Sequence, residues 1–435
     1  METKFSPDQL LDANTREAEK ILRTCVHCGF CTATCPTYVL LGDELDSPRG
    51  RIYLIKDMLE NDRPGTPEVV KHVDRCLSCL SCMTTCPSGV NYMHLVDHAR
   101  AHIEKTYRRP WKDRLLRTFI ALVLPHRDRF RLALRVAALA RPFHGLLKRI
   151  PGTGQIVAMV DLALEQKLGP LAKITSQSLV ANGPRRARVA LLSGCAQPIL
   201  RPSINEATIR LLTRHGVEVV LSKGEGCCGA LVHHMGKEAA SLDYARRNIN
   251  AWIAEMDGKG LDAIVITASG CGTTIKDYAY ALREDSDYAE KARRVSSITK
   301  DITEYLADVP LVPARGTGET VAYHSACSLQ HGQQVRDLPK RLLKKVGFDV
   351  RDVPEGHICC GSAGTYNILQ PELSQKLRDR KVANIRKVKP DIIASGNIGC
   401  IIQIGQTAGI PTLHTIELLD WATGGPWPVA LGSPQ

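Results

Sequence analysis

Residues 25–36 read CVHCGFCTATCP, and residues 76–87 read CLSCLSCMTTCP. Each stretch spaces four cysteines as C-x2-C-x2-C-x3-C and follows the last one with a proline. Cysteines clustered at fixed spacing are typical of metal ligands, and the repeated spacing predicts two sites built in the same way. The cysteines are Cys25, Cys28, Cys31 and Cys35 in the first run and Cys76, Cys79, Cys82 and Cys86 in the second.

This spacing is the ligand pattern of bacterial-type ferredoxins, which hold two [4Fe–4S] clusters. Three thiolates at three-residue intervals wrap one cluster, whereas the fourth lies too far round to reach it and ligates the neighbouring cluster. We therefore assign Cys25, Cys28, Cys31 and Cys86 to one cluster, and Cys76, Cys79, Cys82 and Cys35 to the other. Two structural zinc sites are the alternative, because four-cysteine zinc sites also use C-x2-C pairs, but matched runs ending in Cys-Pro favour the clusters.

The other eight cysteines form two further sets, each with one cysteine, then an adjacent pair followed by glycine, then a last cysteine. These are Cys195, Cys227, Cys228 and Cys271 in one set, and Cys327, Cys359, Cys360 and Cys400 in the other. In both sets 31 residues separate the first cysteine from the pair, and ARVALLSGC before Cys195 resembles ETVAYHSAC before Cys327. The second half of the chain is therefore an internal repeat of about 130 residues.

Each copy of the repeat reads as alternating apolar strands and helices, with its cysteines placed where strands end. Ligands of open α/β sheets gather at the carboxyl ends of strands, so each set predicts one cluster or zinc site. The glycine after each cysteine pair permits the sharp turn that points two adjacent side chains at one site. Buried free cysteines are the alternative. His324, His233 and His234 are further candidate ligands or proton carriers, although a histidine at a strand end is more often simply hydrogen-bonded.

The composition predicts a chain of several domains that buries sizeable cores, since it has 435 residues of which 44% are hydrophobic. Residues 1–20, METKFSPDQLLDANTREAEK, are polar and contain no apolar run. We therefore expect the thiols to form in a reducing, cytoplasmic compartment. Apolar runs such as FIALVL at 119–124 are too short to span a bilayer.

Much of the net charge of +12 lies in one segment, residues 107–150, which carries many arginines against two acidic residues. Its apolar residues have helical spacing, and Pro125 and Pro142 are expected to divide it into short helices. Such a basic amphipathic segment can lie on an anionic membrane surface or dock onto a partner protein. A solvated helical linker is the alternative. No motif for nucleic-acid binding accompanies the charge, so we expect no nucleic-acid partner.

Residues 47–60, SPRGRIYLIKDMLE, lie between the two ferredoxin-type runs and predict a helix that starts at Ser47 and Pro48. Arg49 and Arg51 lie at the start of this helix, and the sequence supports two interpretations of them equally. They either place positive charge beside anionic clusters or are solvated side chains on an exposed helix start.

Two ferredoxin-type runs, DSPRGRI between them and two Cys-Cys-Gly repeats together resemble the glycolate oxidase iron–sulfur subunits. The wider family includes subunits of anaerobic glycerol-3-phosphate dehydrogenases and of heterodisulfide reductases. The resemblance covers about residues 15–419 and includes all sixteen cysteines. It implies a complex that oxidises glycolate to glyoxylate, with D-lactate as a second substrate. FAD-containing subunits would remove the electrons, and this subunit would pass them toward a quinone at the inner face of the cell membrane.

One departure concerns the last cysteine of each repeat. Heterodisulfide reductases have a C-x2-C pair there, whereas this chain has Ala268 and Asn397 at the first of the two positions. Four thiols remain in each set, and these are compatible with a cubane, a smaller cluster or zinc. A heterodisulfide reaction is therefore placed in doubt.

We expect a multidomain α+β protein with four parts. These are a helical two-[4Fe–4S] ferredoxin-type domain at 15–105, a basic helical linker at 106–185, and cysteine-rich α/β domains at 186–310 and 311–424. The expected function is electron transfer within an oxidoreductase whose substrate site lies on another subunit. A reductase acting at the Cys-Cys-Gly sites and a cluster-based redox sensor are the alternatives.

Overall fold

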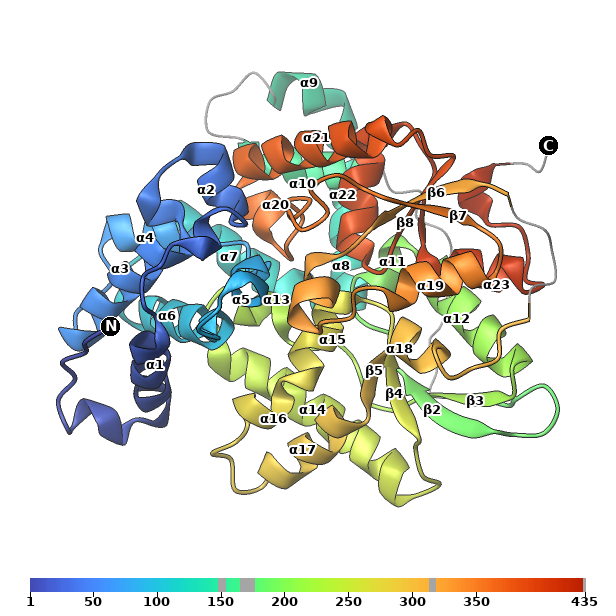
Figure 1. The fold of residues 1–435 in the computed structure, drawn as a ribbon, viewed down its shortest axis with the longest axis horizontal. Helices are drawn as coiled ribbons and strands as arrows, with labels where there is room; N and C mark the ends of the chain where they lie inside the picture. The colour runs from blue at the N-terminus through green and yellow to red at the C-terminus, as the bar shows by residue number, and fades with distance from the viewer. Residues whose placement is uncertain (148–153, 165–176, 313–317, 433–435) are drawn as a thin grey trace.

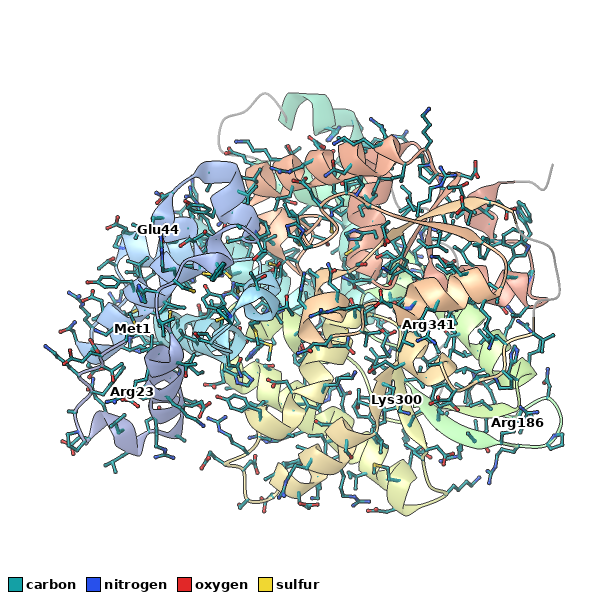
Figure 2. All side chains as sticks on the ribbon, viewed as in Figure 1. Met1, Arg23, Glu44, Arg186, Lys300 and Arg341 are labelled. Atoms are coloured by element: carbon teal, nitrogen blue, oxygen red, sulfur yellow. The ribbon has the colours of Figure 1, made fainter. Side chains whose placement is uncertain are left out.

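The computed structural model describes residues 1–147, 154–164, 177–312 and 318–432. A helical N-terminal region, coloured blue in Figure 1, lies against two α/β regions, coloured green to yellow and orange to red. The predicted multidomain α+β class is confirmed. Charged side chains such as Arg23, Arg186 and Arg341 lie at the surface of this assembly (Figure 2).

The N-terminal region consists of helices joined by the two cysteine runs. Its helices are α1 (Ala13–Thr24), α2 (Pro36–Leu41), α3 (Pro48–Glu60), α4 (Pro67–Asp74), α5 (Ser81–Thr85) and α6 (Tyr92–Thr106), with short 3-10 turns at Gln9–Leu11, Phe30–Thr32 and Glu44–Asp46. The Ser47 side chain caps α3 by accepting a hydrogen bond from the Gly50 N–H, and Pro48 occupies the first turn, as predicted. Ile55, Val73 and Leu95 bring α3, α4 and α6 into one apolar core.

The basic segment forms short helices that follow this region. They are α7 (Trp111–Val123), α8 (Arg127–Ala138), a 3-10 turn (Arg141–Phe143) and α9 (His144–Leu147), and α10 (Gly154–Leu164) comes next. Pro125 lies between α7 and α8, as predicted, whereas α8 already ends at Ala138 and Pro142 lies within the following 3-10 turn. Residues 148–153 and 165–176 of the predicted linker lie outside the described residues.

The first copy of the repeat is built on a five-stranded sheet of order β1-β3-β2-β4-β5, in which only β1 is antiparallel to its neighbour. Its strands are β1 (Gln177–Leu179), β2 (Ala187–Leu191), β3 (Val217–Leu221), β4 (Ala263–Ile266) and β5 (Thr299–Asp301). Its helices are α11 (Gln197–Leu200), α12 (Pro202–Arg214), α13 (Ala230–His233), α14 (Glu238–Asp257), α15 (Ser269–Lys276), α16 (Tyr278–Ala281), α17 (Ala289–Ser297) and α18 (Ile302–Leu306). Strand β1 begins upstream of residue 186, where the sequence placed the start of this domain.

The second copy has a four-stranded parallel sheet of order β7-β6-β8-β9, which repeats the order β3-β2-β4-β5 of the first copy. Its strands are β6 (Thr320–His324), β7 (Asp349–Asp352), β8 (Ile392–Ser395) and β9 (Thr412–His414). Its helices are α19 (Leu338–Lys345), α20 (Tyr366–Leu369), α21 (Pro371–Lys387), α22 (Ile398–Ala408) and α23 (Thr415–Ala422), with a π-helical turn at Ser328–Gly332 and a 3-10 turn at Val429–Leu431.

The two copies share one hydrophobic core. Leu211 and Val219 of the first copy belong to the same buried cluster as Leu413 and Leu419 of the second. Around this core, Asp420 is 1% exposed and accepts hydrogen bonds from Arg210 and Arg214 of α12. The two repeats therefore pack as a single body.

No helix in the described part of the chain is long and apolar enough to span a bilayer.

Candidate metal centres

The first predicted cluster site is a small hollow at the start of α3. Cys25, Cys28, Cys31 and Cys86 line it together, and Cys82 also borders it. Cys25 caps the end of α1, and Cys86 follows α5 from the second cysteine run. Burial raises the pKa of the Cys31 thiol to about 11, and neighbouring Cys25 and Cys35 add to the shift. The grouping of Cys86 with the first run supports the predicted crossed ligation.

The second predicted site lies deeper. Cys76, Cys79 and Cys82 are all buried. Burial raises the pKa of the Cys79 thiol well above its usual range, and nearby Cys327 and Cys35 raise it further. Cys35 therefore lies close to the second run although it belongs to the first, which is the arrangement that crossed ligation needs.

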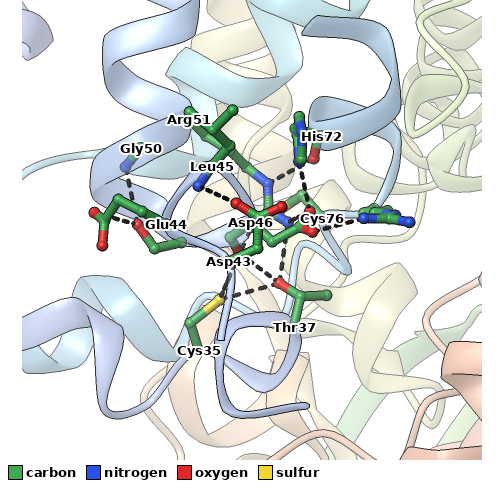
Figure 3. Close-up of polar contacts among 12 residues, drawn as sticks. Cys35, Thr37, Asp43, Glu44, Leu45, Asp46, Gly50, Arg51, His72 and Cys76 are labelled. Carbon is green, nitrogen blue, oxygen red and sulfur yellow. Dashed lines mark hydrogen bonds and ion pairs between the residues drawn. The ribbon is translucent and has the colours of Figure 1, made fainter. Parts of the chain in front are cut away.

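Arg51 lies next to Cys35 in a buried polar network (Figure 3). Its side chain is 1% exposed, and it donates to Asp46 Oδ1 over 3.2 Å and to the His72 carbonyl over 2.6 Å. Arg51 Nη1 lies 3.8 Å from Cys35 Sγ. Arg75 and His72 also contact the Asp46 carboxylate. Arg51 therefore agrees with the first interpretation, in which it places positive charge beside a cysteine site.

Arg49 lies in a different setting. Its side chain is 34% exposed and pairs with Glu44 at 2.8 Å. It also borders the first hollow, where its Nη1 lies 3.4 Å from the His27 carbonyl. Its positive charge is therefore partly compensated by Glu44 and partly screened by solvent.

The Cys-Cys-Gly cysteines all lie at the carboxyl edges of the two sheets. Cys195 and Cys327 follow β2 and β6, and the cysteine pairs follow β3 and β7. The last cysteine of each set lies in the first turn of α15 or α22, just beyond the strand end that the sequence indicated.

The glycine after each cysteine pair is required by the backbone. Gly229 has φ +88° and Gly361 has φ +90°, and a Cβ added to either would approach the backbone oxygen of Ser241 or Ser374 to 2.9 or 2.5 Å. The same turn brings each glycine N–H within 3.4 Å of the Sγ of the first cysteine of the pair. These two matched turns support the predicted role of the glycine.

The thiols of each set converge. Cys327 Sγ lies 3.7 Å from Cys359 Sγ. Side-chain contacts then link Cys359 to Cys360 and Cys360 to Cys400. The first copy has the same chain of contacts, in the order Cys195, Cys227, Cys228 and Cys271. All sixteen cysteines are free thiols, so each set has the four sulfur ligands that a cluster or a zinc ion takes.

The surroundings of the two repeat sites differ. In the first copy, Arg127 of α8 donates to the Gly194 carbonyl over 2.7 Å and lies near Glu225. Burial raises the pKa of Glu225 to about 7 although Ser193 and Arg127 donate to it. In the second copy, His324 lies with Cys360 and Cys400, and its nitrogen is within 4.8 Å of their sulfur atoms.

The structure brings the second ferredoxin-type site and the second repeat site together. Cys79 belongs to the same buried cluster as Cys359, and Cys327 packs against that cluster. Thr84 bonds His331 at 2.7 Å, and the Tyr366 hydroxyl donates to the Arg75 carbonyl over 3.1 Å across the same boundary. No periodicity or spacing in the sequence indicates this contact, because its residues are more than 200 positions apart.

His233 and His234 line a cavity instead of joining a cysteine set. The cavity has a volume of about 580 Å³ and lies between α1 and α6 on one side and α14, α15 and α16 on the other. His233 Nε2 lies 3.1 Å from Asp97 Oδ2, and His94 Nε2 lies 2.9 Å from Asp277 Oδ1. Burial alone would raise the pKa of Asp97, but His233, with smaller effects from His234 and Arg100, lowers it to about 2.

The cavity also touches three of the cysteine sites through neighbouring residues. Ser78 and Leu80 belong to the second cysteine run, Gly270 precedes Cys271, and Ser328 follows Cys327. No spacing or periodicity in the sequence indicates this cavity, because its walls come from separate parts of the chain.

Comparison with known families agrees with these sites. The 4Fe-4S dicluster domain matches residues 24–90, and the cysteine-rich domain matches residues 189–276 and again 321–405. The two predicted ferredoxin-type runs and the predicted repeat fall within these matches, and the chain is an iron–sulfur protein.

Among individual proteins, the glycolate oxidase iron-sulfur subunit of Escherichia coli K12 is 41% identical over 97% of this chain and 99% of its own length. A probable glycolate oxidase iron-sulfur subunit of Bacillus subtilis 168 is 30% identical over 94% and 96%. Lactate utilization protein A of Bacillus licheniformis is 27% identical over 54% of this chain and 99% of its own length. A hypothetical protein from Helicobacter pylori shares the fold, with a TM-score of 0.55 at 10% identity over 97% of this chain and 74% of that one.

Proposed function

The chain belongs to the family of glycolate oxidase iron–sulfur subunits, and from this premise we propose that it carries electrons within a complex that oxidises glycolate to glyoxylate. D-lactate is the proposed second substrate. FAD-containing partner subunits remove the electrons, and this subunit passes them to a quinone. The observation that carries the proposal is the convergence of sixteen free thiols into four sets within one packed body.

The grouping of the thiols supports the following proposed assignment. Cys25, Cys28, Cys31 and Cys86 hold one [4Fe–4S] cluster, and Cys76, Cys79, Cys82 and Cys35 hold the other. Cys195, Cys227, Cys228 and Cys271 hold a third centre, and Cys327, Cys359, Cys360 and Cys400 hold a fourth. Bound iron–sulfur clusters supply one-electron transfer, with potentials set by hydrogen bonds and burial.

The residues around these thiols fix the sites and shield the deeper ones from water. Arg51 places a charge-assisted donor beside Cys35, and the Gly229 and Gly361 turns direct backbone N–H groups at cysteine sulfurs. Leu77 and Ile358 exclude water from the boundary at which Cys79 meets the second repeat. Donors and apolar neighbours of this kind tune the potential of a bound cluster.

The cavity between α6 and α14 is the proposed quinone site. Its volume of about 580 Å³ is within the usual range for small-molecule sites. Reduction of a quinone needs two protons as well as two electrons, and the His94–Asp277 and His233–Asp97 pairs are suited to supply protons. The lining has six carboxylates and only two arginines, so it disfavours an anion such as glycolate. The carboxylates are Asp12, Asp97, Glu238, Asp277, Glu284 and Asp285, and the arginines are Arg246 and Arg283.

The α7 helix is the proposed contact with an anionic membrane surface. Trp111, Leu115, Phe119 and Leu122 are spaced along one face of this helix and are 65%, 62%, 46% and 54% exposed. Lys112 and Arg114 are exposed beside them. Apolar and aromatic side chains flanked by cations bind the interface of anionic bilayers. Co-sedimentation should be strong with vesicles that contain anionic lipid and weak with neutral ones, and Phe119→Asp should reduce it.

The complex can be tested anaerobically. The chain is purified with its co-purifying partners, and cluster absorbance and EPR are followed after addition of glycolate, D-lactate or glycerol-3-phosphate. Bleaching by glycolate in the presence of a flavoprotein supports the proposal. Bleaching by glycerol-3-phosphate alone would assign the chain to another branch of the wider family. If none of the three compounds reduced the clusters although a flavin subunit was bound, the proposed electron relay would be refuted.

The quinone site can be tested separately with Leu242→Trp, which places a larger side chain at the cavity wall. Glycolate should still bleach the clusters, whereas reduction of a water-soluble quinone should fall at least tenfold. Leu231→Trp, outside the lining, is the control. Equal quinone rates in both variants would refute the assignment of the cavity.

A further inference from the structure

His324 is a buried imidazole of the second repeat. It ends strand β6, it is 2% exposed, and neither Nδ1 nor Nε2 has a hydrogen-bond partner among the described residues. Native proteins satisfy nearly all buried polar atoms, so an imidazole with both nitrogens unpaired indicates a group that the protein chain does not supply. Buried His414, which ends strand β9, differs, since its Nε2 bonds the Thr267 carbonyl at 2.8 Å and its Nδ1 accepts from the Ile416 N–H.

The surroundings of His324 are metal ligands. One of its nitrogens and the sulfur atoms of Cys360 and Cys400 all lie within 4.8 Å of one another. Atoms this close to one another can share one centre, because ligand distances to iron or zinc are about 2.0–2.3 Å. The nearby cation Lys381 is already engaged, since its Nζ donates to the Glu355 carbonyl over 2.8 Å.

The first copy of the repeat provides an internal comparison. Leu192 occupies the position that corresponds to His324, since each lies three residues before the first cysteine of its set. Leu192 is 3% exposed and belongs to the same apolar cluster as Cys228. The backbone turn, the glycine and the four cysteines match between the copies, whereas the imidazole occurs in the second copy alone.

We propose that His324 is a ligand of the iron–sulfur centre held by Cys327, Cys359, Cys360 and Cys400. The second centre would then have mixed thiolate and imidazole ligation, and the first would have thiolates only. The inference rests on the proposed cysteine assignment and is independent of the identity of the substrate.

The test uses the full chain purified anaerobically and reduced with dithionite, so that it does not depend on glycolate. Protein labelled with 15N-histidine and unlabelled protein are compared by pulsed EPR, and iron is counted per chain. We expect a nitrogen coupling that changes with the label, and its loss in His324→Ala. His331→Ala is the control, because His331 is bonded to Thr84 and to the His357 carbonyl. His324→Cys supplies a thiolate if the alanine variant loses iron, and it should retain the iron while lacking the coupling.

Three results would overturn the inference. One is a wild-type spectrum without any histidine nitrogen coupling in its reducible centres. Another is a coupling that persists unchanged in both His324 variants, and the third is its equal loss in His331→Ala. Failure of glycolate to reduce the same preparation would refute the proposed function and leave this result intact.

Discussion

Replacement of Arg51 by methionine tests how the protein sets the potential of its second ferredoxin-type centre. Methionine is similar in length but carries no charge, so the change removes the donor 3.8 Å from Cys35 Sγ. At about 4 Å and an effective dielectric constant near 20, a unit charge contributes about 4 kcal/mol. Because about 1.4 kcal/mol corresponds to 59 mV for one electron, the upper limit of the shift is roughly 170 mV. The paired Asp46 reduces this, and we expect a potential lower by on the order of 100 mV.

The same change should reduce stability. Asp46 would lose one of its partners while it stays buried, and removal of one member of a buried ion pair costs about 3–5 kcal/mol. Arg75 and His72 still contact the Asp46 carboxylate, so we expect the lower end of that range for the free energy of unfolding. Urea denaturation under anaerobic conditions measures it.

Two variants separate charge from packing. Arg51→Lys keeps the positive charge and loses the fork of donors, so it should destabilise the fold with a smaller shift in potential. Arg49→Met removes a half-exposed charge beside the first site and should leave the second centre unchanged. EPR-monitored redox titration resolves the centres. Equal potentials of the second centre in Arg51→Met and Arg51→Lys would refute the electrostatic reasoning.

Three further predictions concern the thiol sites and their supports. Cys86→Ser should remove the first EPR-active centre and Cys35→Ser the second, with about four irons lost in each case, whereas uncrossed ligation would reverse this result. Gly361→Ala should abolish the centre of the second repeat, because its Cβ would meet the Ser374 oxygen at 2.5 Å. Gly409 has φ +66° and open space around it, so Gly409→Ala should lower the free energy of unfolding by about 1 kcal/mol in urea denaturation and retain the iron. Burial raises the pKa of Asp301 to about 6, so ionisation of this carboxyl lowers the free energy of unfolding as the pH rises from about 4 to 6. Asp301→Asn should lack this loss, and an equal pH dependence of the urea midpoints of the two proteins would contradict the prediction.

The sequence was sufficient for those features that spacing and periodicity encode. Cysteine spacing separated the four thiol sets, and the repeat of strand and helix patterns predicted two α/β regions with thiols at strand ends. Strands β5 and β9 were not predicted, since three residues such as Thr299–Asp301 carry too little periodicity. Arg51 could not be distinguished from Arg49 by sequence, because burial by distant Asp46 and His72 decides its role.

Features formed between distant segments could not be predicted from the sequence for the same reason. The contact of Cys79 with Cys327 and the cavity lined by His94 and His233 depend on how the helical region packs on the repeats. Local propensity contains no information about that packing, and the charge and helical spacing of the basic segment predicted only a surface or partner contact for it. In the structure part of this charge is internal, since Arg117 bonds Asp74 and Arg127 bonds the Gly194 carbonyl.

The hydrophobic core that the two repeats share has a consequence for the timing of electron flow. Tunnelling between redox groups falls off steeply with their separation, so a hinge between the repeats would make transfer between their two sites sensitive to thermal motion. Leu211 and Leu413 belong to one buried cluster, and Asp420 is bonded across the boundary, so the repeats are held at a fixed separation. Transfer between these two sites should therefore proceed at a fixed rate whatever is bound outside. Control of the overall flux would then lie where electrons enter and leave the protein.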